Sequence, residues 1–147
     1  MDQADRPTMD RPAPDVTTGA PAQAERLSGL RRVLDRLTAA NADLEAKEQA
    51  ARAAAEGGTP VDCLRERSRA TVCGVVRCTT TQPRDGQPAL AADVFDGTGT
   101  VTVVWLGRRT IAGVEPGRRI RVEGLVCARD EARVLYNPRY ELLPPSA

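Results

Sequence analysis

The side chains of this sequence that best suit binding chemistry are arginines and aromatic residues in its second half. Residues 62–147 contain 13 Arg, no Lys and 10 acidic residues, whereas residues 1–61 contain 8 basic and 10 acidic residues. A guanidinium group forms paired hydrogen bonds with phosphate or carboxylate oxygens. The second half therefore carries a mild positive charge made only of groups suited to such contacts.

The arginines that could contact phosphate fall mainly around two expected strand ends. Arg108 and Arg109 follow one apolar run, and the next run begins among Arg118, Arg119 and Arg121, so folding could bring the two groups together. Four further arginines could extend them into a groove: Arg77, Arg84, Arg133 and Arg139. Four acidic residues dilute this charge: Asp93, Glu115, Glu123 and Asp130. A solvated surface of mixed charge is the alternative interpretation.

The aromatic residues number only four: Phe95, Trp105, Tyr136 and Tyr140. Alternation along a strand places Trp105 on the same face as Val101 and Val103, so Trp105 belongs either to the core or to a base-stacking surface. Phe95 is expected in the core. Tyr136 and Tyr140 are better placed for exposure, although Tyr136 could equally close the core. So few aromatic residues argue against tight, general binding of single strands.

The remaining reactive side chains do not form a catalytic or metal-binding pattern. The chain has no His, and its four cysteines lack the CxxC spacing of zinc sites. Cys73, Cys78 and Cys127 lie in apolar strand patterns, where we expect them to be small, buried and reduced. No nucleophile motif or recognisable pair of carboxylates is present. The sequence predicts no cofactor, no metal and no enzymatic activity.

The first 60 residues divide into a tail, a helix and a linker. Residues 1–23 are rich in Pro and polar residues and are expected to be disordered. Residues 24–56 favour one long helix, and residues 57–60, with two Gly and one Pro, form a linker. Without a signal segment or a membrane-spanning apolar run, the protein is expected in the cytoplasm.

The expected helix carries a narrow apolar stripe with heptad spacing. Asn41 occupies position a of one heptad. A buried Asn at that position fixes register and oligomer number in parallel coiled coils. The alternative is that so short a stripe packs on the folded domain instead. The homodimer interpretation uses Leu27, Leu30, Leu34, Leu37, Asn41 and Leu44.

Residues 61–143 read as a β domain, followed by a short tail at residues 144–147. Strands are expected at residues 69–80, 90–95, 101–106, 119–128 and 133–136, the last with a possible extension past Asn137 and Pro138 toward Leu142. Turn residues at 83–86 and 96–99 separate the first three. Residues 107–117 have room for one helical turn. Five such strands, with the longer connection 107–117 between the third and the fourth, predict an OB-type Greek-key barrel.

Four stretches of the sequence lie in or beside the expected strands: residues 72–76, 92–99, 101–105 and 115–124. They resemble OB-fold nucleic-acid-binding domains, including the wedge domain of RecG-type DNA helicases and anticodon-binding OB domains. Residues 36–38, 43–45 and 105–109 are similar to small actinobacterial OB-fold proteins. The resemblance spans residues 36–142 and implies a binding surface.

These observations predict an accessory binder of single-stranded or branched DNA, or of structured RNA, with DNA as the first ligand to test. Its candidate contacts are Arg77, Trp105, Arg108, Arg109, Arg118, Arg119, Arg121, Arg133, Tyr136 and Arg139. Such binding would weaken as salt rises. The rival interpretation is a protein-docking barrel whose helix mediates self-association or attachment.

Overall fold

The structure is a computed structural model that describes residues 21–145, with side chains from residue 31 onward. Of the tail expected at residues 1–23, residues 1–20 lie outside the described residues and residues 21–23 belong to a helix. The chain divides into two units, residues 1–37 and residues 38–147. Within the described residues, no helix is long and apolar enough to cross a membrane.

Helix α1 spans Pro21–Ala55, three residues earlier at its start than the expected 24. It ends in a Schellman motif, in which Gly58 N–H donates to the Ala53 carbonyl and Gly57 N–H to the Ala54 carbonyl. Gly57 has φ of +77°, a conformation that glycine adopts without steric penalty. The Gly pair therefore stops the helix as expected, and the 3₁₀ turn η1 (Val61–Cys63) follows.

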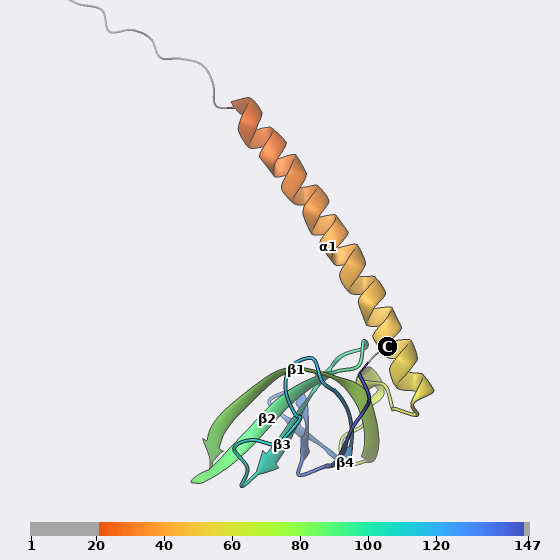
Figure 1. Ribbon diagram of the computed structural model, residues 1–147, viewed down its shortest axis with the longest axis vertical. Coiled ribbons are helices and arrows are strands. Elements are labelled where there is room, and N and C mark those ends of the chain that lie inside the picture. The colour runs from red at the N-terminus through yellow and green to blue at the C-terminus, as the bar shows by residue number, and fades with distance from the viewer. Residues whose placement is uncertain (1–20, 146–147) are drawn as a thin grey trace, which may run out of the picture. The chain divides into compact units, whose positions relative to one another are not determined.

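In the part of the chain that the structure describes, six strands make one sheet, and the first five of them close into a ring. The strands are β1 (Arg69–Arg84), β2 (Gln87–Phe95), β3 (Thr100–Leu106), β4 (Arg119–Arg129), β5 (Ala132–Tyr136) and β6 (Arg139–Leu142). The order β1-β2-β3-β5-β4 is closed by pairing of β4 with β1, and only β3 and β5 run parallel. Figure 1 shows the long β1 curving around the barrel. This confirms the predicted five-stranded OB-type barrel.

The sixth strand is the predicted extension of the fifth. Asn137 has φ of +46° and breaks the strand before Pro138. Its backbone N–H donates to the Val104 carbonyl and its Oδ1 accepts from Leu106 N–H, so the break is anchored to β3. Both β5 and β6 then pair with β4.

The first hairpin turn is tighter than expected. Arg84 pairs with Gln87, leaving Asp85 and Gly86 as a two-residue turn with φ of +50° and +77°. Two positive values are the mark of a type I′ turn, which matches the twist of the flanking strands. Both strands therefore extend closer to the turn than the expected limits of residues 80 and 90.

The core fills the ring with side chains from all five of its strands. Val72, Val94, Val103, Ile120 and Leu135, one from each strand, are fully buried or nearly so. The interior is completed from the segments outside the ring by Val61, Leu64 and Val114. Residues 107–118 contain turns and no assigned helix in the structure, so Val114 reaches the core from a loop.

The turn between β2 and β3 is built around a buried carboxylate. Asp96 is 1% exposed and accepts hydrogen bonds from the N–H groups of Val61, Thr98 and Gly99 at 2.8, 2.8 and 3.0 Å. Gly97, with φ of +97°, lies against the backbone of α1 at Ala46 and Ala50. The turn thus joins the strands, the segment before β1 and the second half of α1.

Candidate nucleic-acid interface

A small buried cluster lies on the outside of the barrel wall. Val103 and Trp105 face the core, so alternation turns Val104 outward, yet Val104 is 0% exposed. It packs with Ala89 of β2 and Val134 of β5. We call this group, with the adjoining Ala91 and Tyr136, the outer cluster. Its three central residues are 0–4% exposed, so the cluster is a second small core on the outer side of β2, β3 and β5.

Two guanidinium groups meet at the tyrosine that borders the outer cluster. Arg84 Nη1 lies 3.1 Å from Tyr136 Oη, and Arg129 Nη1 lies 3.4 Å from the same oxygen. The Arg84 guanidinium also lies over the Tyr136 ring, 5.9 Å from its centroid. The hydrogen bond to Tyr136 raises the pKa of Arg129 further above its ordinary value. We call Arg84, Arg129 and Tyr136 the Tyr136 site.

The three residues meet because each is the last residue of a strand. Arg84 ends β1 before the Asp85-Gly86 turn, and Tyr136 ends β5 at the Asn137 break. Arg129 ends β4 before Asp130 and Glu131, whose φ values of +49° and +65° form a second tight turn. In OB barrels, ligands bind on the face of the second and third strands, between the first and last hairpin loops. The Tyr136 site lies at these two hairpin loops, next to β3, with which Tyr136 pairs at Val104.

A polar group beside the outer cluster contains a cysteine that we expected to be buried. Of the three cysteines assigned to the interior, Cys73 is buried, Cys127 is half-buried and Cys78 is exposed. The Cys78 thiol donates to Asp93 Oδ2 at 3.2 Å, and Thr102 Oγ1 donates to Asp93 Oδ1 at 2.9 Å. The bulge between Val76 and Cys78 shifts the alternation, which explains the error.

We expect Cys78 to react slowly with iodoacetamide at pH 8. Its hydrogen bond to Asp93, then desolvation and the Asp93 charge, raise the pKa of Cys78 and so lower its thiolate fraction. Asp93→Asn should lower that pKa and speed alkylation, measured by peptide mass spectrometry. Thr102→Val keeps the carboxylate and serves as the control. Equal rates in the wild type and Asp93→Asn would contradict this role of Asp93.

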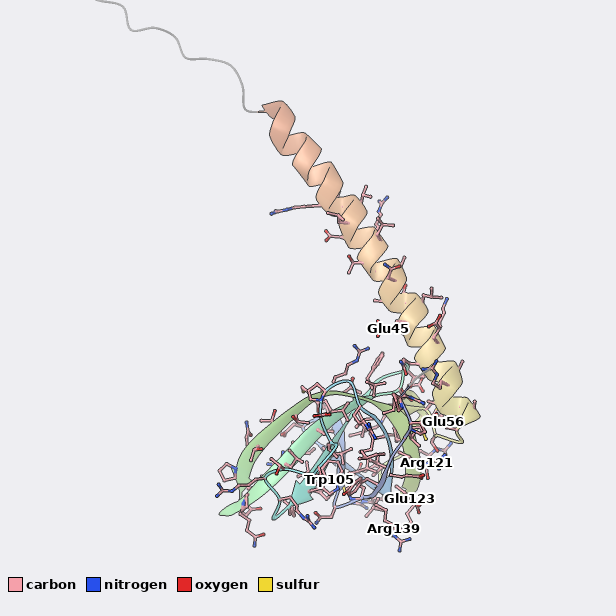
Figure 2. All side chains as sticks on the ribbon, in the orientation of Figure 1. Glu45, Glu56, Trp105, Arg121, Glu123 and Arg139 are labelled. Atoms are coloured by element: carbon pink, nitrogen blue, oxygen red, sulfur yellow. The ribbon has the colours of Figure 1, made fainter. Side chains whose placement is uncertain are left out.

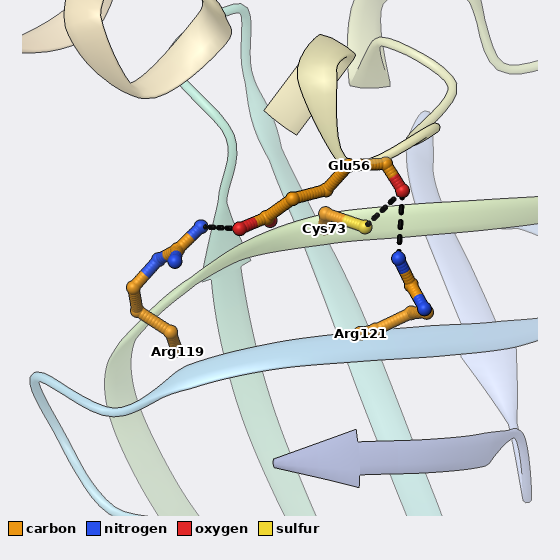
Figure 3. A network of polar contacts seen from close by, with 4 residues as sticks. All are labelled: Glu56, Cys73, Arg119 and Arg121. Atoms are coloured by element: carbon orange, nitrogen blue, oxygen red, sulfur yellow. Dashed lines mark hydrogen bonds and ion pairs between the residues drawn. The ribbon is translucent and has the colours of Figure 1, made fainter. Parts of the chain in front are cut away.

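Two of the expected phosphate contacts instead bind the end of α1. Arg119 is 8% exposed and forms an ion pair with Glu56 Oε1, while Arg121 Nη2 donates to the Glu56 carbonyl at 2.7 Å. Figure 3 shows Glu56 lying between the two arginines, with Cys73 beside its carbonyl. Arg121 also pairs with Glu141 at 3.4 Å. Arg119 is therefore not free to contact a phosphate, and Arg121 is tied to the helix end.

Two other candidate arginines bind α1 and the segment before β1. Arg77 pairs with Glu45 at 3.6 Å and lies over the Phe95 ring, 4.5 Å from its centroid. Arg133 Nη1 donates to the Val61 carbonyl at 2.8 Å. These contacts position the segments around β1 and β5, so we leave both arginines out of the interface.

The two groups of arginines that we expected to meet do not form one patch. Arg109 lies beside Thr81 of β1, whose hydroxyl donates to its carbonyl at 2.8 Å, whereas the Arg118 carbonyl accepts from Val76 N–H. Thr81 lies five positions after Val76 along β1, a distance of about 16 Å at 3.3 Å per residue. Arg108 and Arg109 are exposed and Arg118 is half-buried.

Arg139 lies in a different, mixed-charge surface. Figure 2 shows Arg121, Glu123 and Arg139 together on β4 and β6. Arg139 faces Glu123 across these strands, and both line a shallow pocket of about 200 Å³ with Arg121 and Glu141. The acidic members make this pocket a poor phosphate site.

Trp105 belongs to the core, which was the first of the two alternatives drawn from the sequence. It is 5% exposed, and its ring meets that of Tyr140 edge to face with centroids 5.6 Å apart. A base has no access to the Trp105 ring in this arrangement, so Trp105 is also left out of the interface. Tyr140 is 45% exposed and shields the indole.

Of the ten contacts predicted from the sequence, Tyr136 is the one that belongs to the site formed with Arg84 and Arg129. Arg84 entered the sequence argument as part of a diffuse groove, and Arg129 was missed. The available signal was that Arg129 directly precedes the turn residues Asp130 and Glu131, which places it at a strand end.

No protein-family model and no curated protein matches the chain. Solved structures of 13 chains do match. One is the p204 HINb domain, with a TM-score of 0.46 and 17% identity over 56% of this chain and 44% of that chain. Another is RecG bound to a three-way DNA junction, with a TM-score of 0.49 and 20% identity over 58% of this chain and 12% of that chain. The chain therefore spans less than half the length of each of these two chains.

Proposed function

We propose that the protein is a binding module for single-stranded or branched nucleic acid, with a preference for DNA over RNA. In this proposal it contacts its ligand at the Tyr136 site and catalyses no reaction on it. The observation that carries this is the meeting of Arg84 and Arg129 at Tyr136, which packs on the buried outer cluster. An aromatic ring with flanking guanidinium groups suits a base and its adjoining phosphates.

The preference for unpaired strands follows from the chemistry of the site. A base can lie on the tyrosine ring or on the Arg84 plane only when it is not stacked in a duplex, and branched structures supply such bases at their junctions. One stack is worth about 1–3 kcal/mol. The acidic turn residues Asp85, Asp130 and Glu131 oppose the arginines, so we expect modest affinity that depends strongly on salt.

The test is a fluorescence-anisotropy titration with labelled single-stranded, duplex and three-way branched DNA and with RNA, at about 50 and 200 mM salt. We expect saturable binding that weakens at the higher salt. Arg84→Glu and Arg129→Glu should each weaken it about tenfold or more, because a repulsive charge replaces a phosphate contact. Tyr136→Ala should weaken it by about 5-fold to 150-fold, the range of one stack.

The control is Arg65→Glu, which makes the same charge change at an exposed residue before β1. We expect it to shift affinity by less than about twofold, as a distant surface charge is largely screened. Absence of saturable binding at about 50 mM salt would contradict the proposal. So would equal losses in Arg65→Glu and Arg84→Glu.

The second candidate function is protein docking or self-association through α1. Leu37 and Leu44 of the expected stripe are 57% and 58% exposed, and Asn41 is exposed as well. The side chains of Leu27 and Leu30 lie outside those that the structure describes. Apolar docking responds little to salt or to Arg84→Glu, so the same titrations distinguish the two functions.

A further inference from the structure

Strand β1 has a free edge along its second half. Residues Arg69–Val75 pair with β4 on one side, but from Val76 onward β2 is the only strand partner among the described residues 21–145. On the β4 side, the last backbone hydrogen bonds are the two that join Val76 to Gly117 and Arg118; farther along, the Thr81 hydroxyl donates to the Arg109 carbonyl. Residues 79–83 are exposed except for the half-buried Thr79. A segment of about five residues thus borders the barrel as an unpaired edge.

The hairpin geometry shows which backbone groups face outward. Arg84 and Gln87 flank the two-residue turn and form a hydrogen-bonded pair, so alternate residues before Arg84 also bond to β2. Thr79, Thr81 and Pro83 fall between them and turn their backbone groups away. Pro83 faces Pro88, which agrees with this assignment because neither residue has an N–H to donate.

These outward groups have no backbone partner among the residues described. Apart from strand pairing, no backbone hydrogen bond involves Thr79, Thr81 or Pro83 within residues 21–145. The two Thr N–H groups and three carbonyls therefore form a short template for a further strand. Unpaired edges of this kind attract extended chains.

A pocket lies directly beside this edge. It has a volume of about 340 Å³ and is lined by Thr81, Pro83, Gly86, Pro88 and Arg109. The proline rings give it apolar walls, and the exposed Arg109 places one positive charge at it. Arg108 is the neighbouring residue and is also exposed. The pocket thus fits an apolar side chain with a carboxylate close by.

We propose that residues 79–83 of β1 bind an extended peptide segment of a partner protein as an added strand. The peptide's backbone pairs with Thr79, Thr81 and Pro83, one apolar side chain enters the pocket, and an acidic residue pairs with Arg109. Main-chain pairing supplies affinity in such complexes and the pocket supplies selectivity. The site is independent of the Tyr136 site, since alternation turns the Thr81 and Pro83 side chains to the face opposite that of Arg84.

The test begins with a phage-displayed library of random nine-residue peptides selected against the full chain. Enriched peptides should alternate apolar and polar residues and include Asp or Glu. Their synthetic versions are then titrated by fluorescence anisotropy against Thr81→Pro. This change removes the outward N–H and places a ring on the edge. Position 81 does not bond across the β1–β2 pair, as is also true of Pro83 and Pro88, so the hairpin can accept the proline. We expect binding at least about tenfold weaker.

Two matched controls isolate the cause. Thr81→Val loses the same hydroxyl but keeps the N–H, and should bind the peptides nearly as the wild type does. Arg109→Glu should weaken binding about tenfold or more, whereas Arg108→Glu, which does not line the pocket, should change it far less. Arg84→Glu should leave peptide binding unchanged, which separates this proposal from the nucleic-acid proposal.

Backbone amide exchange keeps the proposal testable if Thr81→Pro fails to fold. In the wild type, saturation with a selected peptide should slow exchange of the Thr79 and Thr81 N–H groups at least about tenfold. The proposal is overturned if no peptide is enriched, if selected peptides bind Thr81→Pro as tightly as the wild type, or if these two amides gain no protection. If nucleic acid displaces the peptides and itself protects the Thr79 and Thr81 amides, the proposal is also overturned, and the edge is a nucleic-acid site instead.

Discussion

Replacing Asp96 by alanine is expected to lower the free energy of unfolding by about 3 kcal/mol or more, because its carboxylate is a buried hydrogen-bond acceptor for three backbone N–H groups. The group is 1% exposed, and the Val61 N–H that it binds at 2.8 Å comes from outside the β2–β3 turn. Without the carboxylate this N–H stays buried and unpaired. The turn and the segment before β1 then separate together.

The effect can be measured by urea unfolding followed through the fluorescence of Trp105, the single and buried Trp of the chain. Asp62→Ala is the control, since its side chain is exposed and close in sequence to the same contact. We expect it to change stability by less than about 1 kcal/mol. An Asp96→Ala protein that unfolds at the wild-type midpoint would show that the carboxylate is not structural.

Gly97→Ala is expected to destabilise the protein by about 3 kcal/mol or more, for a steric reason. A Cβ atom at this position would lie 2.1 Å from the Ala46 carbonyl oxygen and 2.5 Å from the Ala50 nitrogen, both in the backbone of α1. Neither atom can move without displacing the helix, and the φ of +97° adds strain for any residue with a Cβ. We expect faster hydrogen exchange in residues 46–56 as well as a lower unfolding midpoint.

Gly86→Ala is the matched control for this prediction. Gly86 also has a positive φ, of +77°, but a Cβ there would meet nothing within 4 Å. It should therefore show only the conformational penalty of about 1–2 kcal/mol. If both variants lose the same stability, the contact between the β2–β3 turn and the helix contributes nothing measurable.

The barrel could be predicted from sequence because each strand has one face in the core. Val101, Val103 and Trp105 occupy alternate positions and so share one face of their strand, which the structure places in the core. The Asp-Gly pair at residues 85–86 likewise indicated a turn. The predicted limits of β1 and β2 were short by several residues because the turn was predicted over residues 83–86, whereas the pairing of Arg84 with Gln87 leaves Asp85 and Gly86 as the turn. Proline is compatible with a hairpin at positions that do not bond across the strands.

The interface could not be predicted in the same way, because its members meet only through tertiary pairing. Arg84 and Tyr136 are 52 residues apart, and Arg119 and Glu56 are 63 apart. Chemically identical arginines therefore have different roles. Two of them meet at Tyr136, and several others bind the end of α1 or the segments around the barrel. Charge counts cannot separate these roles, since each depends on which side chain lies opposite.

The closure of the ring by β1 and β4 has a consequence for how the chain folds. Arg69 faces Leu125, 56 residues later, whereas the β1–β2 hairpin closes through a two-residue turn. Hairpins form in about 1–10 μs, while folds dominated by distant pairings take milliseconds to seconds. During that interval the edges of β1 and β3 are open to other molecules. We therefore expect refolding yields to fall as protein concentration rises, with aggregation competing against ring closure.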